Sequence, residues 1–123
     1  MTKILVAEDE RDIRELIAFT LRFAGFDVEL ALNGAEAVDK ALAGRPDLIL
    51  MDVRMPKMTG YEACRELKKT PEVQMIPVVF LSAKGQESEI SEGLNVGADD
   101  YILKPFAPDE LIEQVKQILS KKG

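Results

Sequence analysis

The stretch DLILMDVRMPKMTG, residues 47–60, decides how the rest of the chain is interpreted. Its apolar run, Leu48 to Met51, leads directly into the carboxylate of Asp52. A short apolar run between turn-forming residues is typical of a β-strand that is buried on both faces of a sheet. An unpaired charge inside such a strand would be costly, so we expect Asp52 at its end. A solvated strand terminus is the simplest interpretation of that position, and the rest of the chain has to be weighed against it.

Length and composition fit one domain, residues 1–123, that is large enough to bury a core without disulfides. The chain is 46% hydrophobic and 31% charged, which is ordinary for a globular protein and leaves no run long enough for a membrane span. The apolar segment near the N-terminus is too short for a secretory signal, so we expect a cytoplasmic protein. A net charge of −6 disfavours direct binding to nucleic acid.

The residue types that are missing limit the chemistry. The chain has no histidine, which removes the usual acid or base at neutral pH and the usual zinc ligand. The single cysteine, Cys64, lies near Leu67 in a helical pattern and suits a small core residue better than a nucleophile. Any reaction must therefore use carboxylates, lysine and hydroxyl groups.

Short apolar runs alternate with segments of helical periodicity, which is typical of α/β folds. The pattern predicts five strand–helix units, (βα)5, that form a doubly wound parallel sheet. The predicted strands are Lys3–Ala7, Asp27–Ala31, Leu48–Met51, Pro77–Leu81 and Tyr101–Leu103.

Start and stop signals mark the first three helices. The first helix is expected to stop at Gly25, the second to run from Asn33 to Gly44, and the third to begin at a capping box of Thr59 and Glu62 and to end before Pro71. Their apolar faces are predicted from residues at helical spacing: Ile13, Leu16, Ile17, Leu21 and Ala24 in the first, Val38, Ala41 and Leu42 in the second, and Ala63, Cys64 and Leu67 in the third.

The last two helices differ in how firmly they should be held. The segment from Glu87 to Val96 has only Ile90 and Leu94 as strong apolar anchors, so we expect a weakly held helix that is a candidate for a moving element. The final helix should open at Pro108 and pack through a long stripe, Leu111, Ile112, Val115, Ile118 and Leu119.

Polar residues follow four of the five predicted strands. In an open parallel α/β sheet, ligands bind outside the carboxyl ends of the strands, where these residues would converge. Each one alone is ordinary, as a helix cap, a turn former or a solvated lysine, and only their joint occurrence favours a site. They are Glu8 and Asp9 after the first strand, Asp52 after the third, Ser82 after the fourth and Lys104 after the fifth.

Three carboxylates in one place repel one another and need a cation. Oxygen ligands favour a hard divalent ion such as Mg²⁺ over zinc or copper. Such a site suits phosphoryl transfer, because a cation and Lys104 can hold phosphoryl oxygens while a carboxylate attacks in line, and Asp52 is the best candidate for the nucleophile.

The chain resembles the receiver domains of two-component response regulators. The resemblance covers Lys3 to Leu119 and rests on the motifs ILVAEDE, LILMDVRMPKMTG, VVFLSA and GADDYILKPF. It implies a flavodoxin-like fold with strand order 2-1-3-4-5, for which a chemotaxis receiver is the standard example. It also implies a cis peptide bond between Lys104 and Pro105.

The resemblance also implies roles for the polar residues in two-component signal transduction. Asp52 would accept a phosphoryl group from a phosphohistidine of a sensor histidine kinase or a histidine phosphotransfer protein. Asp9, Asp52 and the main-chain carbonyl of Arg54 would ligate Mg²⁺, and Glu8 would orient metal-bound water. Ser82 and Lys104 would contact the phosphoryl group. The domain would accept its own phosphoryl group and lose it slowly, without turnover of an external substrate.

Receivers transmit the phosphorylation through a conformational switch. Ser82 would move toward the phosphoryl group and Tyr101 would turn inward, which repacks the face formed by the fourth helix, the last strand and the last helix. A downstream output domain or protein would read this face. In relatives that pair through it, the fourth helix carries basic residues, and this chain has Ile90, Glu92 and Gln114 on the two helices. These residues do not favour that way of pairing. A phosphorylation-dependent dimer is kept as an alternative to an output partner.

Two other functions compete with a phosphorylated receiver. Phosphatases and phosphotransferases of the haloacid-dehalogenase type also use a strand-end aspartate, but they carry a second acid two residues later, where this chain has Arg54. A pseudo-receiver would bind partners without phosphorylation, and the intact set of acids, Ser82 and Lys104 argues against it. We also expect the cationic Arg54 and Lys84 to tune the lifetime of the phosphorylated state.

Overall fold

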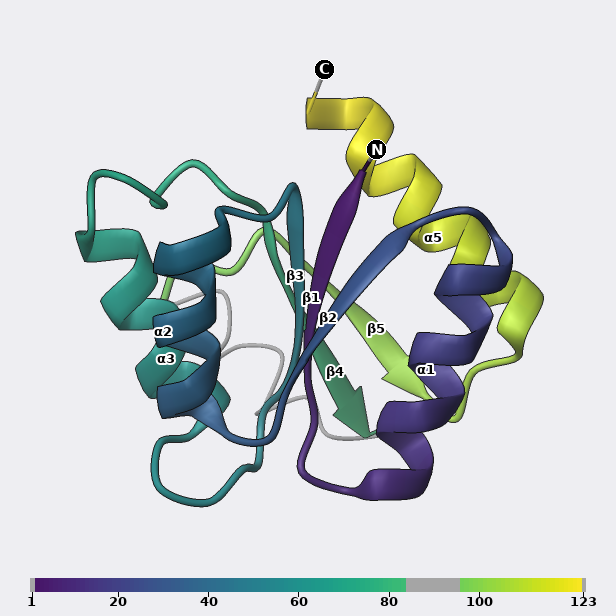
Figure 1. Ribbon diagram of the computed structural model, residues 1–123, viewed down its shortest axis with the longest axis horizontal. Coiled ribbons are helices and arrows are strands. Elements are labelled where there is room, and N and C mark those ends of the chain that lie inside the picture. The colour runs from purple at the N-terminus through teal and green to yellow at the C-terminus, as the bar shows by residue number, and fades with distance from the viewer. Residues whose placement is uncertain (1, 84–95, 123) are drawn as a thin grey trace.

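Five parallel strands form one sheet in the order β2-β1-β3-β4-β5 (Figure 1). The structure is a computed structural model that describes residues 2–83 and 96–122. The strand order confirms the order that the resemblance to receiver domains implied. The predicted fourth helix, together with Lys84, Ile90 and Glu92, lies outside the described residues apart from Val96. The strands are β1 (Lys3–Ala7), β2 (Asp27–Ala31), β3 (Leu48–Asp52), β4 (Val78–Ala83) and β5 (Asp100–Lys104).

Helices cover both faces of the sheet, which makes the fold doubly wound. Figure 1 shows α1 and α5 on one side of the strands and α2 and α3 on the other. The helices that the structure describes are α1 (Arg11–Phe23), α2 (Gly34–Gly44), α3 (Gly60–Lys69) and α5 (Pro108–Lys122).

The neighbouring strands β1 and β3 place alternate side chains in two separate cores, one on each face of the sheet. Ile4 and Val6 of β1 pack on the side of α1 and α5, with Ile17, Leu21, Leu111 and Val115. Leu5 and Ala7 pack on the side of α2 and α3, with Ala37, Ala41, Cys64 and Leu67. Because both faces are covered, these strands are apolar without alternation, as parallel strands of this kind usually are. Cys64 is fully buried, as predicted.

Capping residues fix the starts of α2 and α3 where the sequence predicted them. The Asn33 side chain accepts a hydrogen bond from the backbone N–H of Glu36, 2.9 Å away. Thr59 and Glu62 form a reciprocal capping box. Helix α2 ends at Gly44, and the next residue, Arg45, takes the left-handed conformation with φ of 44° that closes many helices.

Some details of the prediction are wrong. Leu16 and Leu42 were assigned to buried helix faces but are 48% and 38% exposed. The buried face of α1 instead contains Ile17, Ala18, Thr20 and Leu21, and that of α2 contains Gly34, Ala37 and Ala41. Strand β4 continues to Ala83, so Ser82 lies within the strand, where the predicted strand stopped at Leu81. The reason is pairing, because Ser82 and Ala83 face Leu103 and Lys104 of β5.

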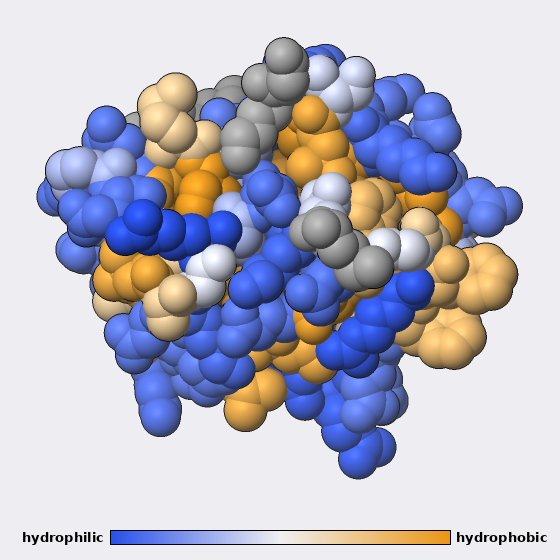
Figure 2. Space-filling model, turned by 45° about the horizontal axis from the view of Figure 1, so that its top comes forward, coloured by the Kyte–Doolittle hydropathy of each residue, from blue (hydrophilic) through white to orange (hydrophobic). Residues whose placement is uncertain are grey.

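The face of the molecule shown in Figure 2 is mainly polar. In Figure 2, hydrophilic residues cover most of the visible face, and hydrophobic groups protrude at its right edge, the side of α1 and α5 in Figure 1. The largest exposed apolar side chains of α1 are Phe19 and Phe23, whose rings stack with centroids 6.5 Å apart. Among the described residues, no helix is long and apolar enough to cross a membrane.

Candidate functional site

Three strands deliver charged residues to the same edge of the sheet. Glu8 and Asp9 directly follow β1, Asp52 is the last residue of β3, and Lys104 is the last residue of β5. Since β1 and β3 are neighbours with Ala7 opposite Met51, the residues that follow this pair lie side by side. The structure therefore brings together the three predicted acids and the predicted lysine.

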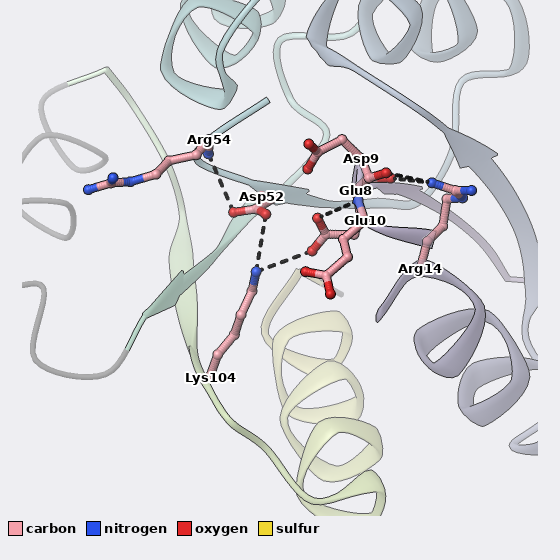
Figure 3. A network of polar contacts seen from close by, with 7 residues as sticks. All are labelled: Glu8, Asp9, Glu10, Arg14, Asp52, Arg54 and Lys104. Carbon is pink, nitrogen blue, oxygen red and sulfur yellow. Dashed lines mark hydrogen bonds and ion pairs between the residues drawn. The ribbon is translucent and has the colours of Figure 1, made fainter. Parts of the chain in front are cut away.

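Lys104 forms the centre of the charged network (Figure 3). Its Nζ atom donates to Oδ2 of Asp52 at 3.1 Å and to Oε1 of Glu8 at 3.2 Å. Only 1% of the Glu8 side chain and 13% of the Asp52 side chain are exposed, so both ion pairs are shielded from water. Hydrogen bonds between charged groups are stronger than neutral ones, and low exposure reduces their screening.

The surroundings shift the pKa values of two members of the network. Burial, together with the hydrogen bond and the negative charge of Asp52, raises the pKa of Glu8 to about 7. The pKa of Lys104 is raised because the attraction of Asp52 and Glu8 outweighs its own desolvation. Lys104 is therefore positively charged at neutral pH. The carboxyl group of Glu8 gains or loses its proton near neutral pH.

The three acids fit a hard divalent cation. Each of Glu8, Asp9 and Asp52 offers a carboxylate oxygen, and these atoms lie within 4.8 Å of one another. Asp9 is exposed, so the cluster is open to solvent on one side. Carboxylate oxygens with access to water are the ligands that Mg²⁺ prefers, since it keeps several of its waters when bound. The donor set is thus suitable for Mg²⁺ and unsuitable for zinc or copper.

The loop between β3 and α3 folds back against Asp52. The backbone N–H of Arg54 donates to Oδ1 of Asp52 at 3.4 Å, and the N–H of Gly60 donates to the carbonyl of Val53 at 2.9 Å. A Cβ atom on Gly60 would lie 2.3 Å from the carbonyl oxygen of Asp52, closer than real contacts allow. Glycine is therefore needed here for close approach of the two backbones.

Ser82 and Tyr101 lie on the two strands beyond Asp52. Ser82 is 1% exposed and follows Leu81, the residue of β4 that is paired with Asp52. Tyr101 lies near the start of β5, about 10 Å along the strand from Lys104, and is 38% exposed. It lines a groove of about 300 Å³ with Leu103, Pro105, Phe106, Glu110 and Gln114. The Lys104–Pro105 bond is cis, as the resemblance implied.

One participant was not identified from the sequence. Arg14 of α1 donates from one guanidinium nitrogen to the carbonyl oxygens of Glu8 at 3.0 Å and of Asp9 at 3.1 Å. A basic residue one turn into an amphipathic helix is common, and nothing in its spacing indicates a contact with the preceding turn. Only the folded path of the chain shows it.

Comparisons with known proteins agree with this geometry. The chain is 40% identical over 121 residues to the phosphate regulon transcriptional regulatory protein PhoB of Rhizobium meliloti (strain 1021), with 98% of this chain and 53% of that protein covered. It is 42% identical over 119 residues to the response regulator MprA of Mycobacterium avium (strain 104), with 97% and 51% covered. The chain thus spans about half the length of these two relatives.

Solved structures match over almost the whole chain. The chemotaxis response regulator CheY4 of Vibrio cholerae superposes with a TM-score of 0.90 at 35% identity, covering 96% of this chain and 98% of that one. The signal receiver domain of a signal transduction histidine kinase from Syntrophus aciditrophicus gives a TM-score of 0.90 at 39% identity, covering 98% and 92%. Residues 4–116 match the response regulator receiver domain family, and the chain belongs to that family.

Proposed function

We propose that the chain, as a single domain of residues 1–123, is a phosphoacceptor receiver in which Asp52 carries the phosphoryl group. The observation that supports this most directly is the ammonium of Lys104 between the carboxylates of Asp52 and Glu8, with Asp9 beside them. A nucleophilic carboxylate, a fixed cation and a set of oxygen ligands are the parts that phosphoryl transfer needs.

The chemical step is an in-line displacement at phosphorus. A carboxylate oxygen of Asp52 forms a bond to the phosphorus of a phosphohistidine while the bond from phosphorus to the imidazole nitrogen breaks. The imidazole takes the electron pair of the broken bond and leaves as a neutral group when its other ring nitrogen already carries a proton. The donor is a sensor histidine kinase or a histidine phosphotransfer protein, since the chain has no histidine. Lys104, already 3.1 Å from Asp52, is placed to bind an oxygen of the transferred group.

The cation in this proposal is Mg²⁺. Asp9, Asp52 and the main-chain carbonyl of Arg54 would hold it, and Glu8 would orient water in its shell. When bound, Mg²⁺ supplies positive charge that offsets the clustered carboxylates and the oxygens of the phosphoryl group. Ser82, buried next to Asp52, completes the contacts to that group.

The output is a change of the face that contains Tyr101. Phosphorylation draws Ser82 toward the site, Tyr101 turns inward from its half-exposed position, and a downstream output domain or protein binds the altered surface. The groove beside Tyr101 is the described part of that surface. A phosphorylation-dependent dimer is the alternative occupant of the same face.

In this proposal the receiver works in the cytoplasm, where histidine kinases present their phosphohistidines. The domain itself contacts neither nucleic acid nor a membrane. It loses its phosphoryl group by slow hydrolysis and does not turn over external substrates. The pseudo-receiver and the phosphatase of the haloacid-dehalogenase type remain the competing hypotheses.

One experiment separates these functions. The protein is incubated with Mg²⁺ and a small acyl phosphate such as acetyl phosphate, and the intact mass is measured. We expect the addition of one phosphoryl group, none in chelator and none for Asp52→Asn. The matched control is Asp47→Asn at the opposite end of β3, which should label like the wild type. Full labelling of Asp52→Asn would refute the assignment, and release of phosphate much faster than the slow hydrolysis proposed for the receiver would favour the phosphatase.

The switch is tested with the two tyrosines of the chain. In Tyr61→Phe, Tyr101 is the remaining tyrosine, so its ring signals are observed alone by NMR. Acetyl phosphate should shift these signals in Tyr61→Phe, but not after Lys104→Ala is added, although labelling of Asp52 continues. Unchanged signals in fully phosphorylated Tyr61→Phe would contradict the proposed movement.

A further inference from the structure

The turn between β1 and α1, residues 8–10, carries two of the three clustered acids. Consecutive residues of an extended chain point to opposite sides. Nevertheless, carboxylate oxygens of Glu8 and Asp9 lie within 4.8 Å of each other and of Asp52. The backbone of this turn must therefore be held in one particular conformation for the cluster to exist.

Glu8 is held by several contacts of its own. Its N–H donates to the carbonyl of Ala31 at 3.1 Å, which extends the pairing with β2. Its carboxylate is bound by Lys104 at 3.2 Å and by the backbone N–H of Glu10 at 3.3 Å. Glu8 is also almost fully buried. Loss of any one contact leaves it anchored by the others.

Asp9 is in a different situation, because it is exposed. In the described part of the chain, its carbonyl is tied by the guanidinium of Arg14, which binds the carbonyl of Glu8 at the same time. Arg14 is itself fixed in α1, where its backbone N–H donates to the carbonyl of Glu10 at 2.9 Å. In Figure 3, Arg14 lies on the side of the turn away from Lys104, so Arg14 holds the backbone of the turn while Lys104 binds the Glu8 carboxylate from the other side.

We propose that Arg14 is a positioning residue that sets the affinity of the acidic cluster for a divalent cation by holding the backbone of Asp9. This inference rests on the proposed Mg²⁺ site and does not depend on phosphoryl transfer. Groups that orient metal ligands without touching the metal change affinity by about 10-fold to 100-fold when removed. Because Arg14 binds the backbone and not the carboxylates, we expect the lower end of that range.

Position and charge make opposite predictions for Arg14, which makes the inference testable. If Arg14 acted only through its charge, its removal would make the cluster more negative and tighten the binding of Mg²⁺. If it acts by holding the turn, its removal frees Asp9 and weakens binding. Arg11 provides the matched control, since it lies in the same turn of α1 and forms an exposed ion pair with Asp12.

The experiment measures the binding of Mg²⁺ by calorimetric titration and by the rise in thermal midpoint that Mg²⁺ causes. The proteins compared are the wild type, Arg14→Gln, Arg14→Lys and Arg11→Gln. We expect the Kd for Mg²⁺ to rise about tenfold in Arg14→Gln and to stay unchanged or fall slightly in Arg11→Gln. Arg14→Lys keeps the charge, but its side chain is one bond shorter and brings its nitrogen less close to the two carbonyls, so its Kd should lie between those of the wild type and Arg14→Gln. Midpoints in chelator verify that each variant folds.

The outcomes separate this inference from the proposed function. Equal Kd values for Arg14→Gln and Arg11→Gln would refute the positioning role while leaving the Mg²⁺ site intact. Absence of Mg²⁺ binding by the wild type would refute the site itself. If Arg14→Gln does not fold, Arg14→Lys carries the test, and a wild-type Kd for that variant would then count against the positioning role.

Discussion

The ammonium nitrogen of Lys104 lies 3.1 Å from a carboxylate oxygen of Asp52, although 52 positions separate the two residues. Their strands are not neighbours, because β4 lies between β3 and β5. The side chain of Lys104 must therefore reach across the end of β4, over about 10 Å at the usual strand spacing. The same ammonium nitrogen also donates to Glu8, which directly follows β1, so one cation connects the ends of three strands, β1, β3 and β5.

This arrangement predicts that the charge of Lys104 stabilises the metal-free fold. Lys104→Met keeps most of the stem but leaves Glu8, which is 1% exposed, without its cationic partner. We expect a loss of about 2 kcal/mol in the free energy of unfolding at pH 8 in chelator. Urea unfolding measures it, with Lys116→Met on the exposed face of α5 as the control. Equal stability of Lys104→Met and wild type would contradict the prediction.

The raised pKa of Glu8 predicts how stability depends on pH. Its pKa is about 7 in the folded state and 4.5 in the unfolded chain, so the folded state binds more protons between these values. The free energy of unfolding in chelator should therefore fall as pH rises from 4.5 through 7. Glu8→Gln should flatten this part of the profile, and Glu15→Gln, exposed on α1, should not. The measurement is urea unfolding at half-unit steps of pH.

Lys104 forms ion pairs with Glu8 and Asp52, whereas Asp9, the third acid of the cluster, has no ion pair with Lys104 in the described part of the chain. The charge of Asp9 adds repulsion to Glu8 and Asp52 without a matching attraction, so Asp9→Asn should raise the thermal midpoint in chelator. Because Asp9 is exposed, the gain should be below about 1 kcal/mol. Mg²⁺ should stabilise the wild type more than the mutant. Asp12→Asn, exposed in the first turn of α1, is the control, and a lower midpoint for Asp9→Asn would argue against crowding.

The close approach of Gly60 to Asp52 predicts that replacement by alanine destabilises the fold at Gly60 but not at Gly44. Gly60→Ala places a Cβ atom 2.3 Å from the carbonyl of Asp52, so the loop or the strand end has to shift. We expect a loss of about 1–3 kcal/mol and slower labelling of Asp52. Gly44→Ala meets only the ends of flexible side chains of Lys3 and Glu29, and it should be neutral or stabilising. Urea unfolding of the two variants makes the comparison, and equal effects would show that the backbone contact does not matter.

The sequence predicted the sheet well because burial on both faces leaves a strong signal. Apolar runs such as Leu48–Met51 have one stable interpretation when both layers are covered by helices. Capping residues such as Asn33 and Thr59 also act locally, so their effect is visible without the fold. The strand ends are less local. Ser82 joins β4 because β5 pairs with it, and pairing between strands cannot be read from the fourth strand alone.

In the candidate site too, features set by the local sequence were predicted, and features that depend on the folded chain were not. The acids and Lys104 were predicted because polar residues directly follow apolar strands and parallel strands end at one edge. Arg14 was not predicted, because its contacts are with backbone carbonyls that any sequence would provide. The exposure of Leu16 was not predicted either, since helical spacing marks an apolar face without showing which residues the neighbouring helix covers.

The last prediction concerns the lifetime of the phosphorylated state. Hydrolysis of an acyl phosphate needs a water aligned opposite the aspartyl oxygen, and a carboxamide or carboxylate nearby is able to accept a hydrogen bond from it. Arg54, two residues after Asp52, and Lys84, two residues after Ser82, have no acceptor, and their long stems can cover the phosphoryl group. We therefore expect slow loss of phosphate, which suits a lasting output.

The lifetime is measured as the decay of the phosphorylated protein in Mg²⁺ buffer without a kinase. Arg54→Asn and Lys84→Glu should each shorten the half-life severalfold, because each introduces an acceptor and removes a covering stem. Lys69→Glu, exposed at the far end of α3, changes charge in the same way as Lys84→Glu and should leave the half-life unchanged. If both mutants decay as slowly as the wild type, these side chains do not shield the site. If Lys69→Glu also shortens the half-life, net charge and not shielding controls the hydrolysis.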